Sequence, residues 1–369
     1  MKDNQKALFL PFMQIPTGHH HVADALMEAF QKMNHTIPCQ KVDILSYSYG
    51  RIECLVSSTY LFWIKQIPQS YNWLYDQLAY KQVSKRNRQL LYEAIFTYFF
   101  KRLIRETEPA ILFCTHSLPS HLASRLKRNR KLAAVTVNVY TDYFVNRVWG
   151  IDGIDYHIVP TVQVKAFLMS HGVKEGHIFV TGIPVHEAFV QTASLPEDKR
   201  NITVLVSGGS LGVGEIYQIL SNRSSHKNLH YYVLCGKNEK LYQQLVSRSD
   251  PHVTPIPYLT SKQEMNQLYD KVDAVLTKPG GVTISECLKK NKAVFIYHAL
   301  PGQEKINLEQ LQELGVVIPI NTDHGSIEDQ IIRYFSDEVW QKQYQKNITD
   351  YHKNLEKKSL TEILKVMMS

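Results

Sequence analysis

The sequence predicts an α/β protein of two domains, each a parallel β-sheet with helices on both faces. Three observations support this fold class. The chain has 369 residues, which is enough for two domains of ordinary size. Short apolar runs alternate with longer amphipathic runs along most of the chain, which is typical of β–α–β units. The alternation restarts after a polar stretch near residue 195, so we expect a second domain and a cleft between the two.

The first half of the chain contains six expected strands separated by helical segments. Helices are expected from about His20 to Met33 and from Pro119 to about Asn129. A third helix should end at Gly172, because glycine readily adopts the left-handed conformation that closes a helix. Residues 55–107 are expected to be helical, with a break at Pro68. The expected strands are KALFLPFMQ, HTIPCQKVDIL, PAILFCTH, AAVTVNVYTD, DYHIVP and HIFVTGIPV.

The second half repeats the same pattern after residue 200. Its first strand runs into a glycine-rich turn, and polar residues follow several of the later strands. Ligands of open α/β sheets bind beyond the carboxyl ends of the strands, so these polar residues are candidate binding groups. The expected strands lie within NITVLVSGGSLGVG, LHYYVLCGK, HVTPIPYLT, VDAVLTKPGG, AVFIYHALPGQ and VVIPI.

Composition indicates a globular protein with reduced thiols. The five cysteines are odd in number and form no CxxC pair, which argues against a zinc site and for a cytoplasmic setting. The N-terminus lacks the features of a signal peptide. The longest strongly apolar uncharged run, residues 54–64, is well short of the roughly 20 residues that span a bilayer.

Positive charge is concentrated in the first half of the chain. The net charge is +8, of which residues 1–190 carry +7. Residues 51–131 hold 14 Lys and Arg against 5 Asp and Glu, and they are rich in aromatic residues. This combination favours an anionic membrane surface as partner. A solvated basic face is the alternative; nucleic acid is not expected, because no recognisable nucleic-acid motif is present.

Residues 59–89 are the expected membrane-facing segment. Aromatic side chains there could lie at the lipid interface, with cations close behind for anionic headgroups. The alternative is an amphipathic helix that packs its aromatic residues into the first domain. The residues concerned are Trp63, Tyr71, Trp73, Lys81, Lys85, Arg86 and Arg88.

Three successive strand ends in the second half suit a nucleotide sugar. The turn SGGSLGVG, residues 207–214, can direct backbone N–H groups at an anion. In TKPGGVTISE, Gly280 and Gly281 permit close approach to phosphate at a helix start, and Glu286 could accept two ribose hydroxyls. A plain helix cap is the alternative. The loop ALPGQEKIN then presents amide and carboxylate groups suited to sugar hydroxyls, namely Gln303, Glu304 and Asn307.

These motifs resemble a known family of glycosyltransferases. TKPGGVTISECLKKNKAVFIYHALPGQEKINLEQLQELG is similar to the donor-site signature of monogalactosyldiacylglycerol synthases and processive diacylglycerol glucosyltransferases. GHHHVADAL, VYTDYFVNRVW and VTGIPV match further blocks of that family. The family usually has more glycine than this chain at residues 14–17.

The resemblance implies a GT-B fold, in which two Rossmann-like domains with parallel sheets face a central cleft. The acceptor and membrane domain would span residues 1–192 and the UDP-sugar domain 200–340, with 341–369 crossing back to the first domain. The implied donor-binding residues are Gly18, Ser207, Gly208, Gly209, Ser210, Tyr258, Leu259, Lys278, Gly280, Gly281, Thr283, Glu286, Gly302, Gln303, Glu304 and Asn307.

An inverting transfer, as the resemblance implies, needs a base for the acceptor hydroxyl. His19 is one candidate, since its ordinary pKa suits proton transfer near neutrality, and Asp142 is the other. His19 could instead contact the donor, and Asp142 could orient His19. The chain has no Asp-x-Asp, and the consecutive histidines 19–21 do not share one face, so we expect no metal or other cofactor. His116 either lines the acceptor site or is a satisfied polar group.

The sequence therefore predicts a glycosyltransferase that moves a hexose from a UDP-sugar to a lipid acceptor such as diacylglycerol. We expect it on the inner face of the cell membrane as a peripheral protein. The alternatives are another acceptor, such as a polyprenyl-linked cell-wall intermediate or a small molecule, a UDP-sugar epimerase, and a UDP-sugar sensor without activity.

Overall fold

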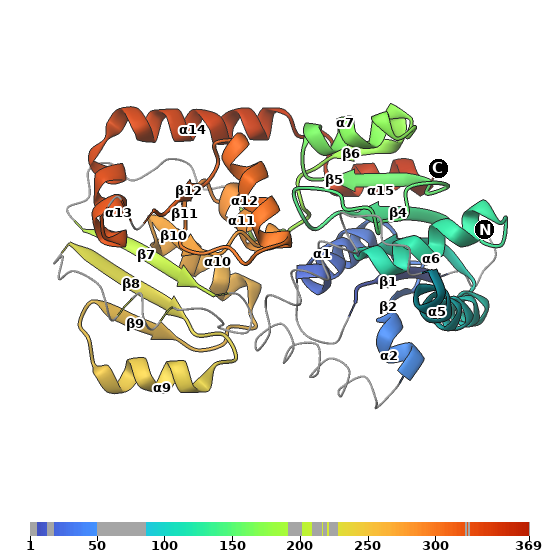
Figure 1. Cartoon of the computed structure of the whole chain (residues 1–369), viewed down its shortest axis with the longest axis horizontal. Coiled ribbons are helices and arrows are strands. Elements are labelled where there is room, and N and C mark those ends of the chain that lie inside the picture. The colour runs from blue at the N-terminus through green and yellow to red at the C-terminus, as the bar shows by residue number, and fades with distance from the viewer. Residues whose placement is uncertain are drawn as a thin grey trace. The chain divides into compact units, whose positions relative to one another are not determined.

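The chain forms two compact units. A computed structural model describes residues 6–12, 18–49, 86–190, 201–208, 216, 220, 228–321, 323 and 325–368. Unit 1 comprises Met1–Pro184 and Asn354–Ser369, and unit 2 comprises Val185–Lys353. Each unit contains a six-stranded sheet whose described strand pairs are all parallel, as the strand–helix alternation predicts (Figure 1).

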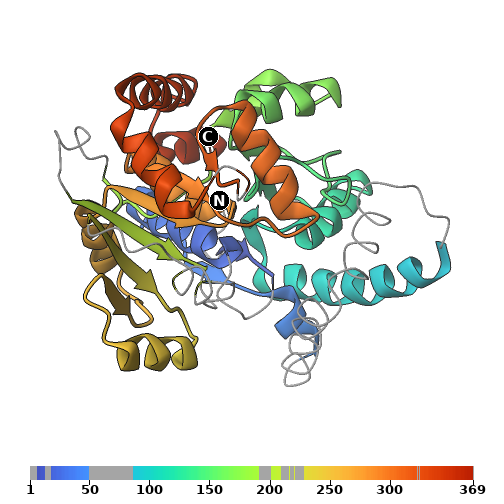
Figure 2. The same ribbon diagram turned by 60° about the vertical axis from the view of Figure 1, so that its left-hand side comes forward.

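The sheet of unit 1 has the strand order β2-β1-β3-β4-β5-β6. Its strands are β1 (Lys6–Leu10), β2 (Cys39–Lys41), β3 (Pro109–Cys114), β4 (Val135–Val139), β5 (Tyr156–Val159) and β6 (Ile178–Val180). Its helices are α1 (Gly18–Met33), α2 (Ile44–Tyr49), α5 (Arg86–Thr107), α6 (Ser117–Arg128), α7 (Val162–Ser170) and α15 (Leu360–Met368), with a 3-10 turn at Glu175–His177. Figure 2 shows α5 side-on as the long cyan helix.

Both faces of this sheet are covered, which explains the continuous apolar runs of its strands. Successive side chains of a strand point to opposite faces. Leu8 accordingly joins the cluster formed with Phe100 of α5 and Leu122 of α6. Phe9 lies on the other face, where it stacks on Phe113 and meets Phe30 of α1 edge-on. On this second face the last helix of the chain, α15, packs against α1.

Helix ends in unit 1 follow the local sequence. Thr161 caps α7, because its hydroxyl accepts a hydrogen bond from the Val164 amide at 3.3 Å. Gly172 follows the helix with a φ of +87°, in the left-handed region. This confirms the predicted glycine stop. Of the expected helical stretch 55–107, the structure describes residues 86–107, and these are the helix α5.

Unit 2 has the strand order β12-β11-β10-β7-β8-β9. Its strands are β7 (Ile202–Ser207), β8 (Leu229–Leu234), β9 (Val253–Ile256), β10 (Ala274–Thr277), β11 (Ala293–Ile296) and β12 (Ile318–Pro319). Its helices are α9 (Glu239–Arg248), α10 (Lys262–Lys271), α11 (Gly281–Lys289), α12 (Gln303–Glu313), α13 (Ile327–Ser336) and α14 (Glu338–Lys353).

The division of the chain differs from the sequence-based boundaries in two places. Unit 2 begins at Val185 rather than near residue 200, and the segment that returns to unit 1 begins at Asn354 rather than at 341. The second difference arises because α14 stays with unit 2. Tyr344 of this helix donates a hydrogen bond to the Val316 carbonyl at 2.8 Å and accepts one from the Val294 amide at 3.0 Å.

Each sheet has one place where the strand order reverses. In unit 1 the chain runs from β1 to β2 and then returns to β3 on the other side of β1. In unit 2 it runs from β7 through β8 to β9 and then returns to β10 on the other side of β7. Connections leave such neighbouring strands toward opposite faces, so their carboxyl ends are the usual ligand sites of open α/β sheets.

The segment after β4 is fixed to α6 through Gly150. Ser120 Oγ donates to the Gly150 carbonyl and accepts from the Gly150 amide, both at 3.0 Å. Asn138 Nδ2 donates to the same carbonyl at 2.7 Å. A Cβ at residue 150 would overlap Ser124 Cβ and lie 2.6 Å from the Ser120 carbonyl oxygen. Only glycine therefore fits at this position.

Gly150→Ala is expected to lower the free energy of unfolding by about 1–3 kcal/mol, because either the segment or α6 must move. Urea denaturation monitored by circular dichroism measures this loss. Gly176→Ala is the control, since a Cβ there would meet nothing within 4 Å. Equal midpoints for the two variants would contradict the tight packing at Gly150.

Candidate functional site

The strand-order reversal in unit 1 brings together the histidines that the sequence singles out. His19 lies in the first turn of α1, which follows β1, and His116 directly precedes α6, which follows β3. Thr141 and Asp142 come next along the sheet, after β4. The parallel order of β1, β3 and β4 places these residues at one edge of the sheet.

His19 is held by the backbone of the neighbouring strand end. Its Nδ1 lies 2.7 Å from the Thr115 carbonyl oxygen and 3.0 Å from Thr141 Oγ1. A carbonyl oxygen can only accept, so Nδ1 carries the proton and Nε2 keeps its lone pair. The Thr115 hydroxyl in turn donates to the His19 carbonyl at 3.1 Å. The contacts at Nδ1 set the tautomer and restrain the ring, and the Thr115 hydroxyl ties the first turn of α1 to the end of β3.

The surroundings of His19 favour its neutral form. Burial lowers the pKa of the imidazole below its ordinary value, and the negative charge of Asp142 opposes part of that effect. A neutral imidazole with a free Nε2 is the form that can accept a proton. Asp142 is half-buried in the segment after β4 and acts on His19 electrostatically.

His116 is the N-cap of α6. Its Nδ1 accepts a hydrogen bond from the Leu118 amide at 3.1 Å. Its ring stacks on Phe12, with centroids 4.3 Å apart, and meets the His19 ring edge-on at 4.9 Å. His116 is therefore a satisfied polar group, one of the two roles expected for it, and its ring also contacts His19.

The strand-order reversal in unit 2 brings together two of the predicted donor segments. Ser207 ends β7 and Gly208 follows it, and both are buried; Lys278 follows the neighbouring strand β10. Gly280 is the N-cap of α11 and offers no side-chain cap to the helix amides. A Cβ at Gly280 would meet nothing within 4 Å, so there is room at this helix end.

Uncapped amides and the helix dipole together favour an anion at the start of α11. Gly281 and Thr283 both lie in this first turn. Ser285 is not available to a ligand in the same way, because its hydroxyl donates to the Gly281 carbonyl at 2.9 Å within the helix.

Glu286 lies in the second turn of α11 and is buried. Tyr269 of α10 donates its hydroxyl proton to Glu286 Oε2 at 3.0 Å. Burial raises the pKa of the Glu286 carboxyl to about 7, although Lys262 and the Tyr269 hydrogen bond act in the opposite direction. An ionised carboxylate can accept hydrogen bonds at both oxygens, whereas the protonated form uses one oxygen as a donor.

Gln303, Glu304 and Asn307 were expected on a loop, but the structure places all three in the helix α12. Gly302 is the N-cap, with a φ of +89°, and no side chain caps the helix. Glu304 Oε2 accepts a hydrogen bond from the Leu300 amide at 2.7 Å, so one oxygen of this carboxylate is already bonded within the chain. Asn307 is buried in unit 2, whereas Gln303 is half-buried at the helix start.

Tyr258 and Leu259 follow β9, where a nucleobase was expected. Tyr258 is exposed, and the Lys237 ammonium lies over its ring, 5.5 Å from the centroid. Lys237 is itself exposed and follows the end of β8, the neighbour of β7. Lys237 and Lys278 therefore follow the two strands on either side of β7.

Sequence reasoning missed Lys237 and Tyr269. The position of Lys237, directly after Gly236 at a strand end, was a usable signal. Tyr269 lies within a helix and gave none. Phe12 was likewise read only as part of a strand.

Several candidates lie outside the described residues. They are Gly209, Ser210, Trp63, Tyr71, Trp73, Lys81 and Lys85. Arg86 and Arg88 belong to the first turn of α5 by their backbone. Gly18, the remaining donor candidate, begins α1.

Within the described residues, no three His, Cys, Asp or Glu side chains are grouped so that they could hold a metal ion. None of their helices is both long and apolar enough to cross a membrane.

Two family descriptions match the chain. Residues 19–185 match the monogalactosyldiacylglycerol (MGDG) synthase family, and residues 203–360 match the glycosyltransferase family 28 C-terminal domain. The first covers the His19 and His116 region, and the second covers the glycine turn and α11.

Two curated relatives and one solved structure extend this similarity. An uncharacterized glycosyltransferase of Bacillus subtilis, YkoN, is 43% identical, with 97% of this chain and 96% of the relative covered. The processive diacylglycerol β-glucosyltransferase of Bacillus subtilis is 26% identical, with 99% and 96% covered. MurG of Acinetobacter baumannii has a TM-score of 0.59 at 11% identity, with 98% of this chain and 99% of MurG covered. This last likeness shows a shared fold.

Proposed function

The chain belongs to the family of GT-B glycosyltransferases that includes monogalactosyldiacylglycerol synthases and processive diacylglycerol β-glucosyltransferases, and we propose that its own donor is a UDP-sugar and its acceptor a lipid hydroxyl. Diacylglycerol is the simplest such acceptor. The observation that carries the proposal is the open start of α11 at the strand-order reversal of unit 2, with Glu286 in the following turn.

In this proposal the donor binds along the carboxyl edge of the unit 2 sheet. The first-turn amides of α11 and the turn after Ser207 hold the diphosphate. Glu286 accepts the two ribose hydroxyls, Tyr258 and Leu259 hold the base, and Gln303 contacts the sugar. Lys237 and Lys278 supply positive charge on either side of the turn.

The transfer step uses His19 as general base. The acceptor hydroxyl gives its proton to His19 Nε2, and its oxygen forms a bond to the anomeric carbon of the hexose. The bond from that carbon to the diphosphate oxygen breaks, and UDP leaves with the electron pair. Attack from the face opposite UDP inverts the anomeric centre. The proton on Nδ1, held by the Thr115 carbonyl, keeps Nε2 free for this role.

Fixed dipoles stabilise the leaving diphosphate in this proposal, without a divalent cation. The uncapped amides at the start of α11 are fixed in place before the reaction, so they can stabilise the charge that develops on the diphosphate. Transfer is therefore expected to continue at an unchanged rate in excess EDTA. A rate that falls in EDTA and returns on addition of Mg²⁺ or Mn²⁺ would show that a cation takes part.

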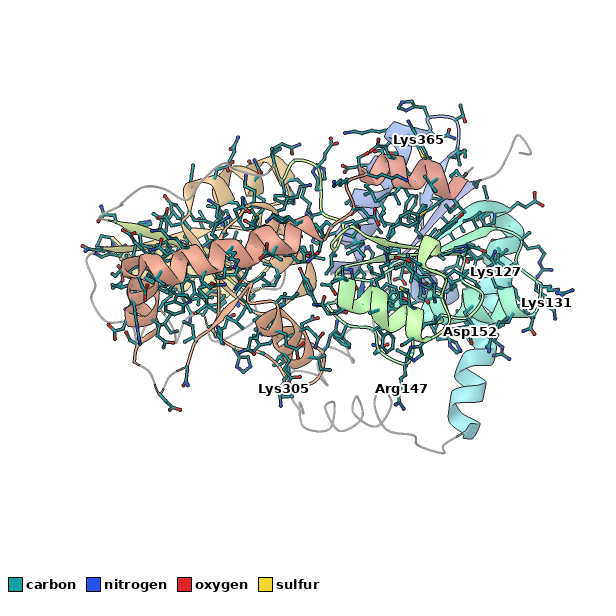
Figure 3. The ribbon with its side chains drawn as sticks, turned by 90° about the horizontal axis from the view of Figure 1, so that it is seen from above. Lys127, Lys131, Arg147, Asp152, Lys305 and Lys365 are labelled. Carbon is teal, nitrogen blue, oxygen red and sulfur yellow. The ribbon has the colours of Figure 1, made fainter. Side chains whose placement is uncertain are left out.

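We further propose that unit 1 attaches to the anionic inner surface of the cell membrane. Residues 86–131 hold 10 Lys and Arg against 3 Asp and Glu. Arg128, Arg130 and Lys131 are exposed at the end of α6, where Figure 3 labels Lys131. Polybasic surfaces bind anionic lipid more weakly as salt increases. The protein should float with phosphatidylglycerol liposomes and not with phosphatidylcholine liposomes, whereas recovery at the bottom with both would contradict attachment.

One assay tests the function directly. Radiolabelled UDP-glucose, UDP-galactose and UDP-N-acetylglucosamine are each incubated with the protein and diacylglycerol, and lipids are separated by thin-layer chromatography. Labelled lipid from one donor supports the proposal. Label appearing only in polyprenyl-linked or water-soluble products would assign another acceptor. Interconversion of the UDP-sugars without acceptor would assign epimerase activity, which family membership does not favour.

A further inference from the structure

His116 has a tautomer fixed by the helix that it caps. Nδ1 accepts the Leu118 amide hydrogen at 3.1 Å, so it carries no proton, and the neutral ring must carry its proton on Nε2. Burial lowers the pKa of His116 well below its ordinary value, with His19 adding to the effect, so the ring stays neutral. His116 and His19 thus hold opposite tautomers, each set by a backbone partner.

The ring of His116 lies between two other rings. Phe12 stacks on one side at a centroid distance of 4.3 Å and an interplanar angle of 10°. His19 meets it at 4.9 Å and 88°, the edge-to-face arrangement that aromatic rings prefer. Capping a helix requires only an acceptor atom, which Asn or Ser supplies as well. The cap therefore does not explain why the side chain is an aromatic ring in this place.

The polar contacts that the structure gives to the His19 ring are both at Nδ1, from Thr115 and Thr141. They restrain the ring on that side, and hydrogen bonds still allow small tilts of the ring. The His116 ring, packed edge-on against the imidazole, limits these tilts and supplies a second restraint.

We infer that His116 is a positioning residue for the proposed base, because its ring limits the tilt of His19 and so keeps Nε2 aimed at the acceptor hydroxyl. The inference rests on the proposed function and adds to it. It differs from the expected role of His116 in lining the acceptor site, since His116 here acts through His19.

Removal of the ring should also change the titration of His19. The charged or titratable groups that act on His19 are Asp142, His20 and His116. Asp142 raises the pKa, whereas burial and His20 lower it. A smaller side chain at residue 116 admits water to His19, so the pKa of His19 should rise toward its ordinary value.

Two variants separate the ring from the cap. His116→Asn keeps an acceptor for the Leu118 amide and removes the ring, and His116→Phe keeps a ring and removes the acceptor. For His116→Asn we expect kcat to fall about tenfold with an unchanged KM for the UDP-sugar, and the acid limb of the rate profile to move to higher pH. For His116→Phe we expect a kcat within about twofold of the parent and a lower melting temperature.

The reverse pattern, with His116→Phe losing kcat and His116→Asn keeping it, would overturn the inference, as would parent-like kcat in both variants. Histidine ¹⁵N NMR provides a reading that needs no transfer reaction. The His19 resonances, assigned by their loss in His19→Asn, should show Nδ1–H in the parent and a raised pKa in His116→Asn. An unchanged His19 titration would contradict the inference even in an active enzyme. Absence of transfer by the parent protein would instead reject the proposed function.

Discussion

His19→Asn lowers kcat for hexose transfer by about 10²–10⁴-fold and leaves the affinity for the UDP-sugar nearly unchanged. The Asn side chain can still donate from its amide to the Thr115 carbonyl, so the local fold is kept while the proton acceptor is lost. Single-turnover transfer and calorimetric donor binding measure the two quantities separately. His21→Asn, on the same helix, is the matched control and should transfer at the parent rate.

The rate profile of the parent protein gives a second check on His19. The base must be unprotonated, and burial lowers its pKa, so the fall in kcat should set in below the ordinary pKa of histidine. In His19→Asn this acid limb should disappear. Near-normal turnover in His19→Asn, together with an inactive Asp142→Asn, would instead assign the base to Asp142.

Glu286→Gln weakens UDP binding by about 10²-fold, because a charged acceptor of two hydroxyl groups is replaced by a neutral amide. This loss of affinity should depend on the 2′-hydroxyl of the ribose. The parent protein should bind 2′-deoxy-UDP more weakly than UDP, and Glu286→Gln should bind the two with more similar affinity. Isothermal titration calorimetry supplies all four values. Glu313→Gln, an exposed carboxylate at the end of α12, is the control.

The affinity for a UDP-sugar should also depend on pH through Glu286. Burial raises the pKa of this carboxyl to about 7, and only the ionised form accepts both hydroxyls. Binding of UDP-glucose should therefore strengthen as the pH rises through about 7 and should be flatter in Glu286→Gln. The diphosphate of UDP-glucose is fully ionised in this range and adds no slope of its own. A full pH dependence in the variant would remove Glu286 from the ribose site.

The strands and the polar strand ends of this chain could be predicted from sequence because both depend on local patterns. KALFL and PAILFC are buried on two faces, and such strands appear as continuous apolar runs. The residues that follow β1, β3, β7 and β10 stand out because polar and glycine residues interrupt those runs. The strand-order reversals then explain why these segments form the candidate sites.

Other features depend on contacts between distant residues, which no local pattern encodes. Tyr269 reaches Glu286 from a separate helix, and the His19 tautomer is set by a carbonyl 96 residues away. Glu304 looked free in the sequence, yet the fold turns one oxygen back to the Leu300 amide. The helix α14 was assigned to the returning segment, but Tyr344 ties it to unit 2.

A crystal structure with bound UDP-glucose tests the central claim most directly. The account predicts diphosphate oxygens within hydrogen-bond distance of the amides of residues 281–283 and the ribose hydroxyls on the Glu286 carboxylate. A nucleotide bound at another edge of the unit 2 sheet, or a ribose turned away from Glu286, would contradict it.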